Sequence, residues 1–226
     1  LGLIAYQMGD YTAAKRRLRA VIALREQTGE VRFRAHNHSL LARVLAVTGE
    51  HQAAEEHARS GLRLSQSCGD QIGIAAAHLA LSRVEAATGR LTLSQEHCRL
   101  SLATGRQSGN LHLLIDSLIH LGRIELALGR PSDATACFEE AIAAFVALDT
   151  AHSNRVGAAL LGLGWAALAT GDHARAEHYF RETLAARGCA AWEILDANAG
   201  LAQVLAAIRQ TEAAGVAAGA DAGNGD

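Results

Sequence analysis

The feature that most constrains this chain is a phrase that returns at a fixed interval. The stretch LARVLAVTGEHQAA occupies residues 41–54, and close counterparts begin at residues 1, 81, 121 and 163. The spacing is 40 residues between the first four copies and 42 before the last. Internal similarity at such a period predicts a stack of similar units that each contact their neighbours, because one short unit cannot bury its own apolar faces.

Two series of glycines divide each copy in half. One series ends the phrase and the other falls midway, so that a break is expected about every 20 residues, at Gly9, Gly29, Gly49, Gly69, Gly89, Gly109, Gly129, Asp149 (in place of glycine), Gly171 and Gly188. Glycine just past a helix end adopts the left-handed conformation that closes the last turn without a Cβ clash. Between breaks the apolar residues recur at helical spacing, as in Leu111, Leu114, Ile115 and Leu118. Each unit is therefore predicted to be a pair of antiparallel helices.

These observations predict an all-α fold, an α-α solenoid superhelix with a 40-residue period, as a single domain over residues 1–210. Repeats are expected near residues 1–30, 31–70, 71–110, 111–150 and 151–190. A partial sixth repeat is expected over 191–218, with a first helix from about 191 to 208 and a degraded partner helix starting near Thr211. The stretch GADAGNGD at 219–226 is expected to be a disordered tail. Since residue 1 enters in the middle of a first helix, we expect the chain to be a piece of a longer protein.

Small residues stand at two fixed positions of each unit. In the first helix they follow a leucine, at Gly2, Ala42, Ser82, Gly122 and Gly164. In the second helix they are Ala14, Ala54, Ser94, Ala134 and Ala176. This pattern resembles the tetratricopeptide repeat, whose usual period is about 34 residues. The longer period here lengthens both helices by nearly a turn. HEAT-type repeats share the longer period, but they do not explain the breaks in which Gly is followed by Asp, Glu or Arg.

Composition and spacing argue against several function classes. The net charge of −2 at pH 7 predicts no direct binding to nucleic acid or to an anionic membrane. The sequence shows no signal peptide and nothing near 18 consecutive apolar residues, and its four cysteines form no CxxC pair. A cytoplasmic location with free thiols is therefore expected. His36 and His38 are two residues apart and do not converge on one metal. No catalytic constellation can be assembled, so we expect no enzyme activity, no metal and no cofactor.

The resemblance to tetratricopeptide proteins implies a binding surface. In their superhelices the first helix of each pair lines the concave side, and the residue after the small position belongs to that surface. Three arginines recur there, Arg43, Arg83 and Arg123, which we call the arginine ladder; neighbouring rungs are expected about 10 Å apart, the spacing of packed helices. Guanidinium groups suit carboxylate or phosphate, so the partner would be a peptide, a protein segment or an anionic small molecule. Alternatively, the three arginines are only solvated surface residues that recur because the repeat was duplicated, and the sequence does not decide between the two.

Further candidates lie on the same stripe. Asp116 and His120 precede Arg123 at helical spacing, so the three could bind a polar ligand; alternatively, they only hydrogen-bond to one another. Trp165 could provide an aromatic surface on which a ligand stacks beside Arg123; alternatively, its ring only fills a gap between small neighbours. The chaperone-type peptide clamp of the family needs Lys and Asn where Ser39, Leu79 and Ile119 stand, so a chaperone tail is not expected. The full set of candidate groove residues is His36, Ser39, Arg43, Arg83, Asp116, His120, Arg123, Trp165 and Gln203.

The phrasing of the repeat also resembles the C-terminal regions of large bacterial transcription regulators. These include the antibiotic-regulatory family of actinomycetes and the large ATP-binding LuxR-type regulators. The resemblance implies a non-catalytic module that senses a ligand or partner and acts on other domains of the same longer chain, without binding ATP or DNA itself. A stand-alone scaffold that joins two proteins is the alternative function.

Overall fold

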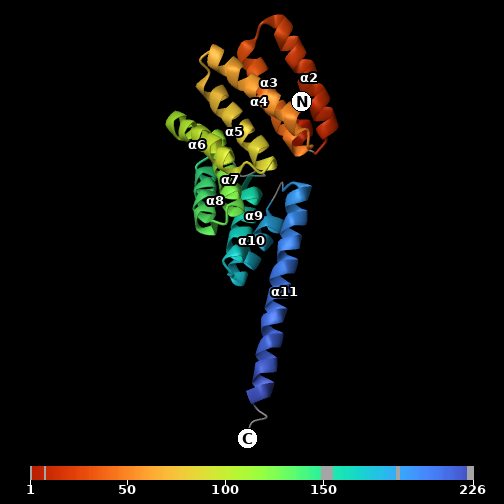
Figure 1. The fold of residues 1–226 in the computed structure, drawn as a ribbon, viewed down its shortest axis with the longest axis vertical. Coiled ribbons are helices and arrows are strands. Elements are labelled where there is room, and N and C mark those ends of the chain that lie inside the picture. Colours follow the sequence, from red (N-terminus) through yellow and green to blue (C-terminus); the bar gives the residue numbers. More distant parts are fainter. Residues whose placement is uncertain (1, 8, 149–154, 187–188, 223–226) are drawn as a thin grey trace.

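A computed structural model of the chain describes residues 2–7, 9–148, 155–186 and 189–222, and all regular structure within these ranges is α-helical. The helices pair in order, α1 with α2 through α9 with α10, and α11 follows (Figure 1). This confirms the predicted all-α solenoid. The helix bounds are α1 Gly2–Gln7, α2 Tyr11–Thr28, α3 Val31–Val47, α4 His51–Ser67, α5 Gln71–Ala87, α6 Leu91–Ser108, α7 Leu111–Ala127, α8 Pro131–Val146, α9 Arg155–Ala169, α10 His173–Ala185 and α11 Ala191–Ala222.

The predicted breaks are confirmed wherever the structure describes them. Eight of the ten positions are glycines with φ between 64° and 81°, in the left-handed region. At Gly49 an added Cβ would meet no atom within 4 Å, so this glycine is required by its backbone conformation and not by lack of space. The breaks expected at Asp149 and Gly188 lie outside the described residues.

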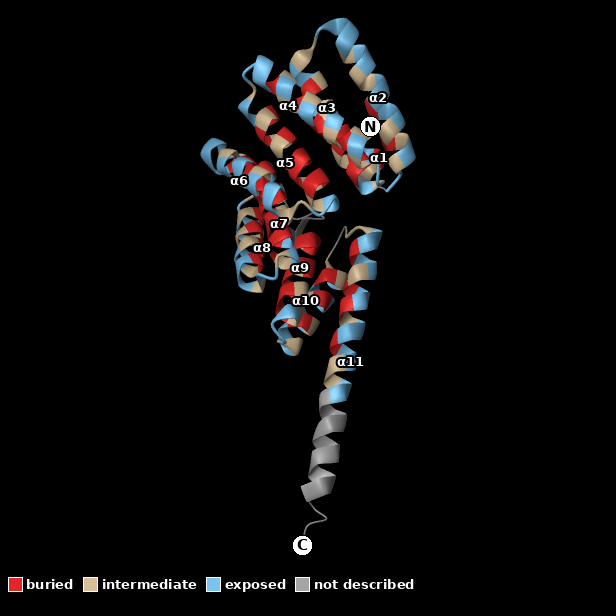
Figure 2. Ribbon diagram, viewed as in Figure 1, coloured by how far each residue is buried: buried red, intermediate tan, exposed pale blue. Residues whose placement is uncertain are grey.

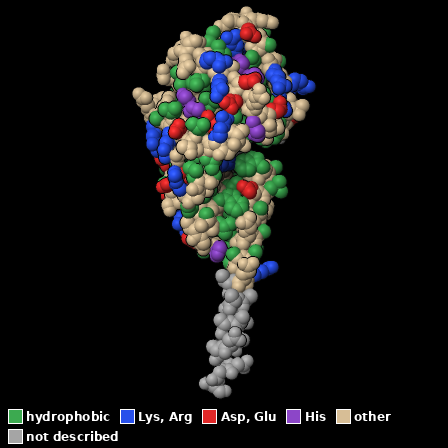
Figure 3. All heavy atoms as spheres, viewed as in Figure 1, with side chains coloured by type: hydrophobic (Ala, Val, Ile, Leu, Met, Phe, Trp, Pro, Cys, Tyr) green, Lys and Arg blue, Asp and Glu red, His purple; other side chains and the backbone are tan. Residues whose placement is uncertain are grey.

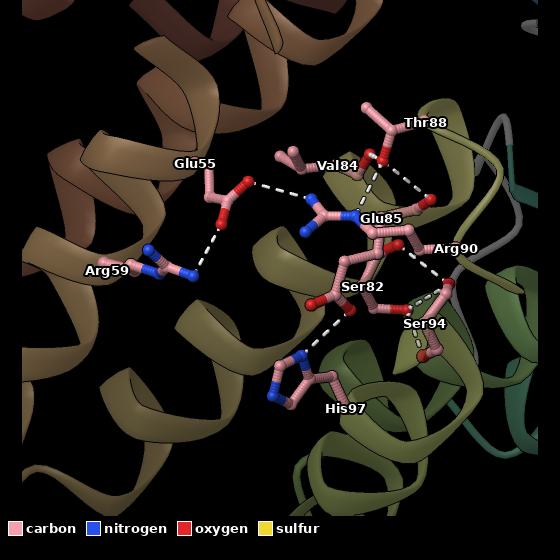
Figure 4. Close-up of polar contacts among 9 residues, drawn as sticks. All are labelled: Glu55, Arg59, Ser82, Val84, Glu85, Thr88, Arg90, Ser94 and His97. Carbon is pink, nitrogen blue, oxygen red and sulfur yellow. Dashed lines mark hydrogen bonds and ion pairs between the residues drawn. The ribbon is translucent and has the colours of Figure 1, made fainter. Parts of the chain in front are cut away.

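The small positions are where paired helices touch. In one pair, Ser82 Oγ donates to the Ser94 carbonyl and Ser94 Oγ donates to the Ser82 carbonyl, each at 2.7 Å (Figure 4). In another, a Cβ added to Gly122 would lie 2.7 Å from the ring of Phe138. The same ring would come within 2.3 Å of a Cβ on Gly162 in the next repeat. The fully buried Phe138 is thus held between two glycines, which confirms that the small residues permit close helix packing.

Successive pairs stack through their neighbouring helices, and the buried residues follow these contacts along the array (Figure 2). Polar groups link helices both between and within pairs. Glu55 of α4 accepts a hydrogen bond from Arg90 Nη2 at 2.8 Å, and within the pair of α5 and α6 the buried Glu85 Oε2 lies 2.9 Å from His97 Nδ1 (Figure 4). The stack is therefore held by an apolar interior together with polar contacts between its helices.

The C-terminal end differs from the prediction. Instead of breaking near residue 209, α11 continues as one helix from Ala191 to Ala222, beyond the body of the array (Figure 1). Neither the separate partner helix expected from Thr211 nor disorder over 219–222 is found, and residues 223–226 lie outside the described part. The physical reason is local: the repeat position that holds Gly49 is occupied here by Arg209, so the left-handed glycine that ends the other first helices is missing. Among the described helices, none is long and apolar enough to cross a membrane.

Candidate binding groove

The first helices α3, α5 and α7 line a cavity of about 540 Å³, which we call the groove. Each contributes the residue after its small position, so that Arg43, Arg83 and Arg123 share one wall, as predicted. The groove is bounded by Tyr6 of α1 and Trp192 of α11, because the array curls until its first and last helices come near each other (Figure 1). On the face drawn in Figure 3, hydrophobic side chains gather around the start of α11, whereas charged and hydrophobic groups are mixed over α2–α5.

The three rungs of the arginine ladder are not equivalent. Arg43 stacks over the ring of Tyr6 at 4.7 Å, and its Nη1 lies 4.0 Å from Asp116 Oδ2. Arg123 stacks over the ring of Trp192 at 5.0 Å. Arg83, between them, has no hydrogen-bond, ion-pair or ring partner in the part of the chain that the structure describes. The central guanidinium is therefore the one left open to a ligand.

Arg83 carries its charge in an unfavourable place. Burial, together with the nearby positive charge of Arg43, lowers the pKa of its guanidinium to about 10, whereas Asp116 opposes the shift. The group is still protonated at pH 7. An anion bound beside it would replace the hydration that it has lost, which is the usual condition for a strong charge-assisted hydrogen bond.

His120 adds a neutral polar group next to Arg83. Its Nε2 atom is buried and has no hydrogen-bond partner among the described residues. Burial lowers the pKa of His120 to about 3, and the positive charges of Arg83 and Arg123 act in the same direction. Arg43 Nε is likewise buried without a partner in the described chain. Buried polar atoms are normally satisfied, and five others in the described chain also lack a partner, so these two atoms support a binding site only together with the unpaired charge of Arg83.

Two carboxyl groups partly offset the positive charge of the arginines in the groove. Asp116 lies beside Arg43, and Glu193 of α11 is only 3% exposed. Burial raises the pKa of Glu193, although the hydrogen bond that Ala190 N–H donates to its Oε2 at 2.8 Å opposes the shift. Three guanidinium groups thus face two carboxyl groups, and the excess charge is positive.

The groove collects six of the nine predicted candidates. These are His36, Arg43, Arg83, Asp116, His120 and Arg123. Ser39 is buried, and its hydroxyl donates to the Ala35 carbonyl at 3.4 Å. Trp165 lies elsewhere, packed edge-on against Phe180 at 5.3 Å and donating to Asp196 Oδ2 at 3.2 Å. Gln203 is exposed on α11 and does not line the groove. That any of these residues binds a ligand stays a prediction.

The aromatic ring beside Arg123 is Trp192, which the sequence did not single out. Trp192 stands ten residues before the small position of α11, where the other repeats hold unrelated residues such as Ile72 and His112. Tyr6 was missed for the same reason. Both reach the groove only because the curvature of the array brings α1 and α11 toward α7, and no local pattern records that curvature.

The fold and the groove define a helical-repeat interaction module. Two profiles of the tetratricopeptide repeat match the chain, one over residues 73–147 and the other over residues 1–67 and 120–191. The protein therefore belongs to the tetratricopeptide-repeat family, whose members are interaction modules and generally non-catalytic scaffolds. No curated protein is significantly similar to the chain in sequence.

Several solved structures share the fold. BtubC from P. vanneervenii superposes with a TM-score of 0.64 at 18% identity, covering 95% of this chain and 91% of that one. A thermophilic tetratricopeptide protein of Thermus thermophilus gives 0.63 at 20% identity, covering 91% and 95%. A Rap protein complexed with competence and sporulation factor gives 0.73 at 12% identity, covering 87% and 53%. At these identities the similarity supports the fold alone.

Proposed function

We propose that the groove binds an extended peptide or protein segment through an acidic group held by the arginine ladder. The observation that carries the proposal is Arg83, which lines a groove of about 540 Å³ without a partner among the described residues. By contrast, Arg106, outside the groove, holds both carboxylate oxygens of Glu140 at 2.8 and 2.7 Å. A peptide segment suits the groove better than a small anion, because the cavity of about 540 Å³ is larger than such an ion and is lined by Tyr6 and Trp192 as well as by the arginines.

We further propose that this array is the partner-sensing region of a larger bacterial transcription regulator. The support is the resemblance of its repeat phrase, LARVLAVTG at 41–49, to the repeats of such regulators. A Walker motif or a winged helix encoded in the same reading frame is the expected finding. A reading frame that encodes only the helical array would instead favour a stand-alone scaffold.

The groove is tested first by identifying a partner. Wild-type protein and the Arg43→Ala/Arg83→Ala/Arg123→Ala variant are used to capture partners from the native host. The matched control is Arg16→Ala/Arg63→Ala/Arg181→Ala, which removes the same charge from exposed positions of second helices. Partners should be lost with the groove variant and kept with the control. Identical recovery by the wild type and the groove variant would move the binding site off this wall.

The contribution of the central rung is then measured with a synthetic peptide from the captured segment. A charge-assisted contact contributes roughly 1.5–3 kcal/mol, so Arg83→Ala should weaken binding at least about tenfold. Arg16→Ala should change it by no more than about 0.5 kcal/mol. Added salt should weaken binding, because the charges of the groove are partly screened. A salt-independent affinity that Arg83→Ala leaves intact would contradict an anionic anchor.

A further inference from the structure

A second cavity of about 550 Å³ adjoins the groove, and we call it the trough. It lies across α3, α5 and α7, and its apolar lining includes Phe33, Leu40, Ile72, Leu79 and Leu113. The groove and the trough adjoin, because both are lined by Arg43, Arg83 and Asp116.

Apolar and charged residues both line the trough. Phe33 is 57% exposed and Ile72 is 37% exposed, so a bound apolar group could cover both side chains. Beside Phe33 and Ile72, Arg32 Nε lies 3.5 Å from Asp70 Oδ2, so the charges there are paired. Arg83, further along α5, is not paired within the described chain.

We propose that the trough takes a bulky aliphatic or aromatic side chain of the same segment whose acidic group is bound by Arg83. This inference rests on the proposed function and specifies its ligand, a segment in which an acidic residue lies close to a large apolar one. A wholly acidic segment would leave Phe33 and Ile72 in water. A wholly apolar segment would cover Arg83 without pairing its charge, which is strongly unfavourable.

The occupant is taken to be a peptide because two adjoining cavities, one with a guanidinium unpaired in the described chain and one with an apolar lining, suit neighbouring side chains of one chain. Neighbouring side chains of an extended chain are separated by about 3.3 Å per residue, so residues a few positions apart can reach adjoining cavities. A fatty-acid-like amphiphile shares the chemistry of an anion joined to an apolar group, and the experiment distinguishes it from a peptide.

The test selects peptides from a random library displayed on phage, using four forms of the protein. Ala76→Trp fills the trough, since Ala76 is half-buried in its lining. Arg83→Ala removes the anchor. Ala136→Trp is the matched control, because Ala136 is exposed on α8. Circular dichroism checks that each variant is folded, and Ala76→Leu replaces Ala76→Trp if the larger residue prevents folding.

Wild type and the Ala136→Trp control should select peptides that carry an acidic residue near Leu, Ile, Met or Phe. Ala76→Trp should keep the acidic preference, lose the apolar one, and bind the best wild-type peptide at least tenfold more weakly. Arg83→Ala should keep the preference for an apolar residue and lose the preference for an acidic one.

Four outcomes would overturn the inference. If Ala76→Trp selects the same peptides with unchanged affinity, or if wild type selects acidic peptides without an apolar preference, the trough is not used, although the proposed function survives. If wild type selects no peptide, the proposed function fails as well. If laurate binds wild type but not Ala76→Trp while no peptide competes with it, the occupant is an amphiphile.

Discussion

The two sides of the array treat their polar groups differently, although both derive from the same 40-residue repeat. Away from the groove, many charged groups are paired with one another, as in Lys15 with Glu50 at 2.7 Å and Arg90 with Glu55 at 2.8 Å. In the groove, the Arg83 guanidinium and His120 Nε2 have no partner within the described residues. Paired groups contribute to the fold, whereas unpaired ones weaken it unless something binds. Single unpaired atoms also occur outside the groove in the described chain, for example at Ser65 and His78. Among the described residues, the groove is therefore distinguished by an unpaired charge, that of Arg83, next to an unpaired His120 Nε2.

The packed side should respond most strongly to mutation. In Gly122→Leu the new side chain must enter the space filled by Phe138, whose ring lies 2.7 Å from the expected Cβ position. Such overpacking costs about 1–3 kcal/mol, which would lower the midpoint of chemical denaturation clearly. The same change at the exposed Ala136 should be nearly neutral. An unchanged midpoint for Gly122→Leu would mean that the helices do not meet at this residue.

The paired charges offer the next test. Glu125 is 3% exposed, accepts a hydrogen bond from Gln95 Nε2 at 2.5 Å, and lies 3.4 Å from Arg130 Nη1. Glu125→Ala should lower the free energy of unfolding by about 1–3 kcal/mol, because a buried donor loses its partner. Glu140→Ala breaks an exposed pair with Arg106 and should cost no more than about 1 kcal/mol. Equal losses in the two variants would show that burial does not determine the strength of these pairs.

The scaffold was predictable because its signals are local. A left-handed glycine such as Gly89, or small residues such as Ser82 and Ser94, act within a few residues or between helices joined by a short turn. Repetition multiplied these weak signals until the helix boundaries were well determined. The same reasoning failed at Arg209, where the repeat was assumed to continue although its terminating glycine was absent.

The groove was predictable only in part. The shared register of Arg43, Arg83 and Arg123 was visible in the sequence, because it depends on the repeat alone. Their unequal surroundings were not, since Tyr6 and Trp192 come from opposite ends of the chain. Which aromatic residue stands beside Arg123 depends on how far the array curls, and that is a sum of small rotations at every helix contact.

The pH dependence of stability sharpens the comparison between paired and unpaired groups. The pKa of His120 is about 3 in the folded protein, compared with about 6.5 in an unfolded chain, so the fold favours its neutral form. The contribution of His120 to the free energy of unfolding is complete above pH 6.5. It is lost as the pH falls toward 3, because the unfolded chain then binds a proton that the folded protein does not. The loss has a limiting slope of about 1.4 kcal/mol per pH unit.

We therefore expect His120→Asn to flatten the decline of unfolding free energy between pH 6 and pH 4, measured by urea denaturation. His38→Asn is the comparison, because burial also lowers the pKa of His38, to about 4, but its Nδ1 lies 2.9 Å from His57 Nδ1 and is thus partnered. His38→Asn should flatten the curve over the same range and also reduce stability at pH 7. A His120→Asn curve parallel to that of the wild type would show that His120 is not held neutral.

The smallest expected effect is a gain in stability at the centre of the ladder. Arg83→Met replaces an unpaired, partly buried charge by an apolar side chain that can follow the same path, and a buried charge without a partner is less favourable than a hydrophobic residue of similar volume. The free energy of unfolding should rise by about 1 kcal/mol or less, while binding of a groove ligand is lost. Arg43→Met should not show this gain, because it removes the contacts with Tyr6 and Asp116. If Arg83→Met is less stable than wild type and Arg43→Met is not, Arg83 supports the fold and the distinction between the two sides of the array does not hold at this residue.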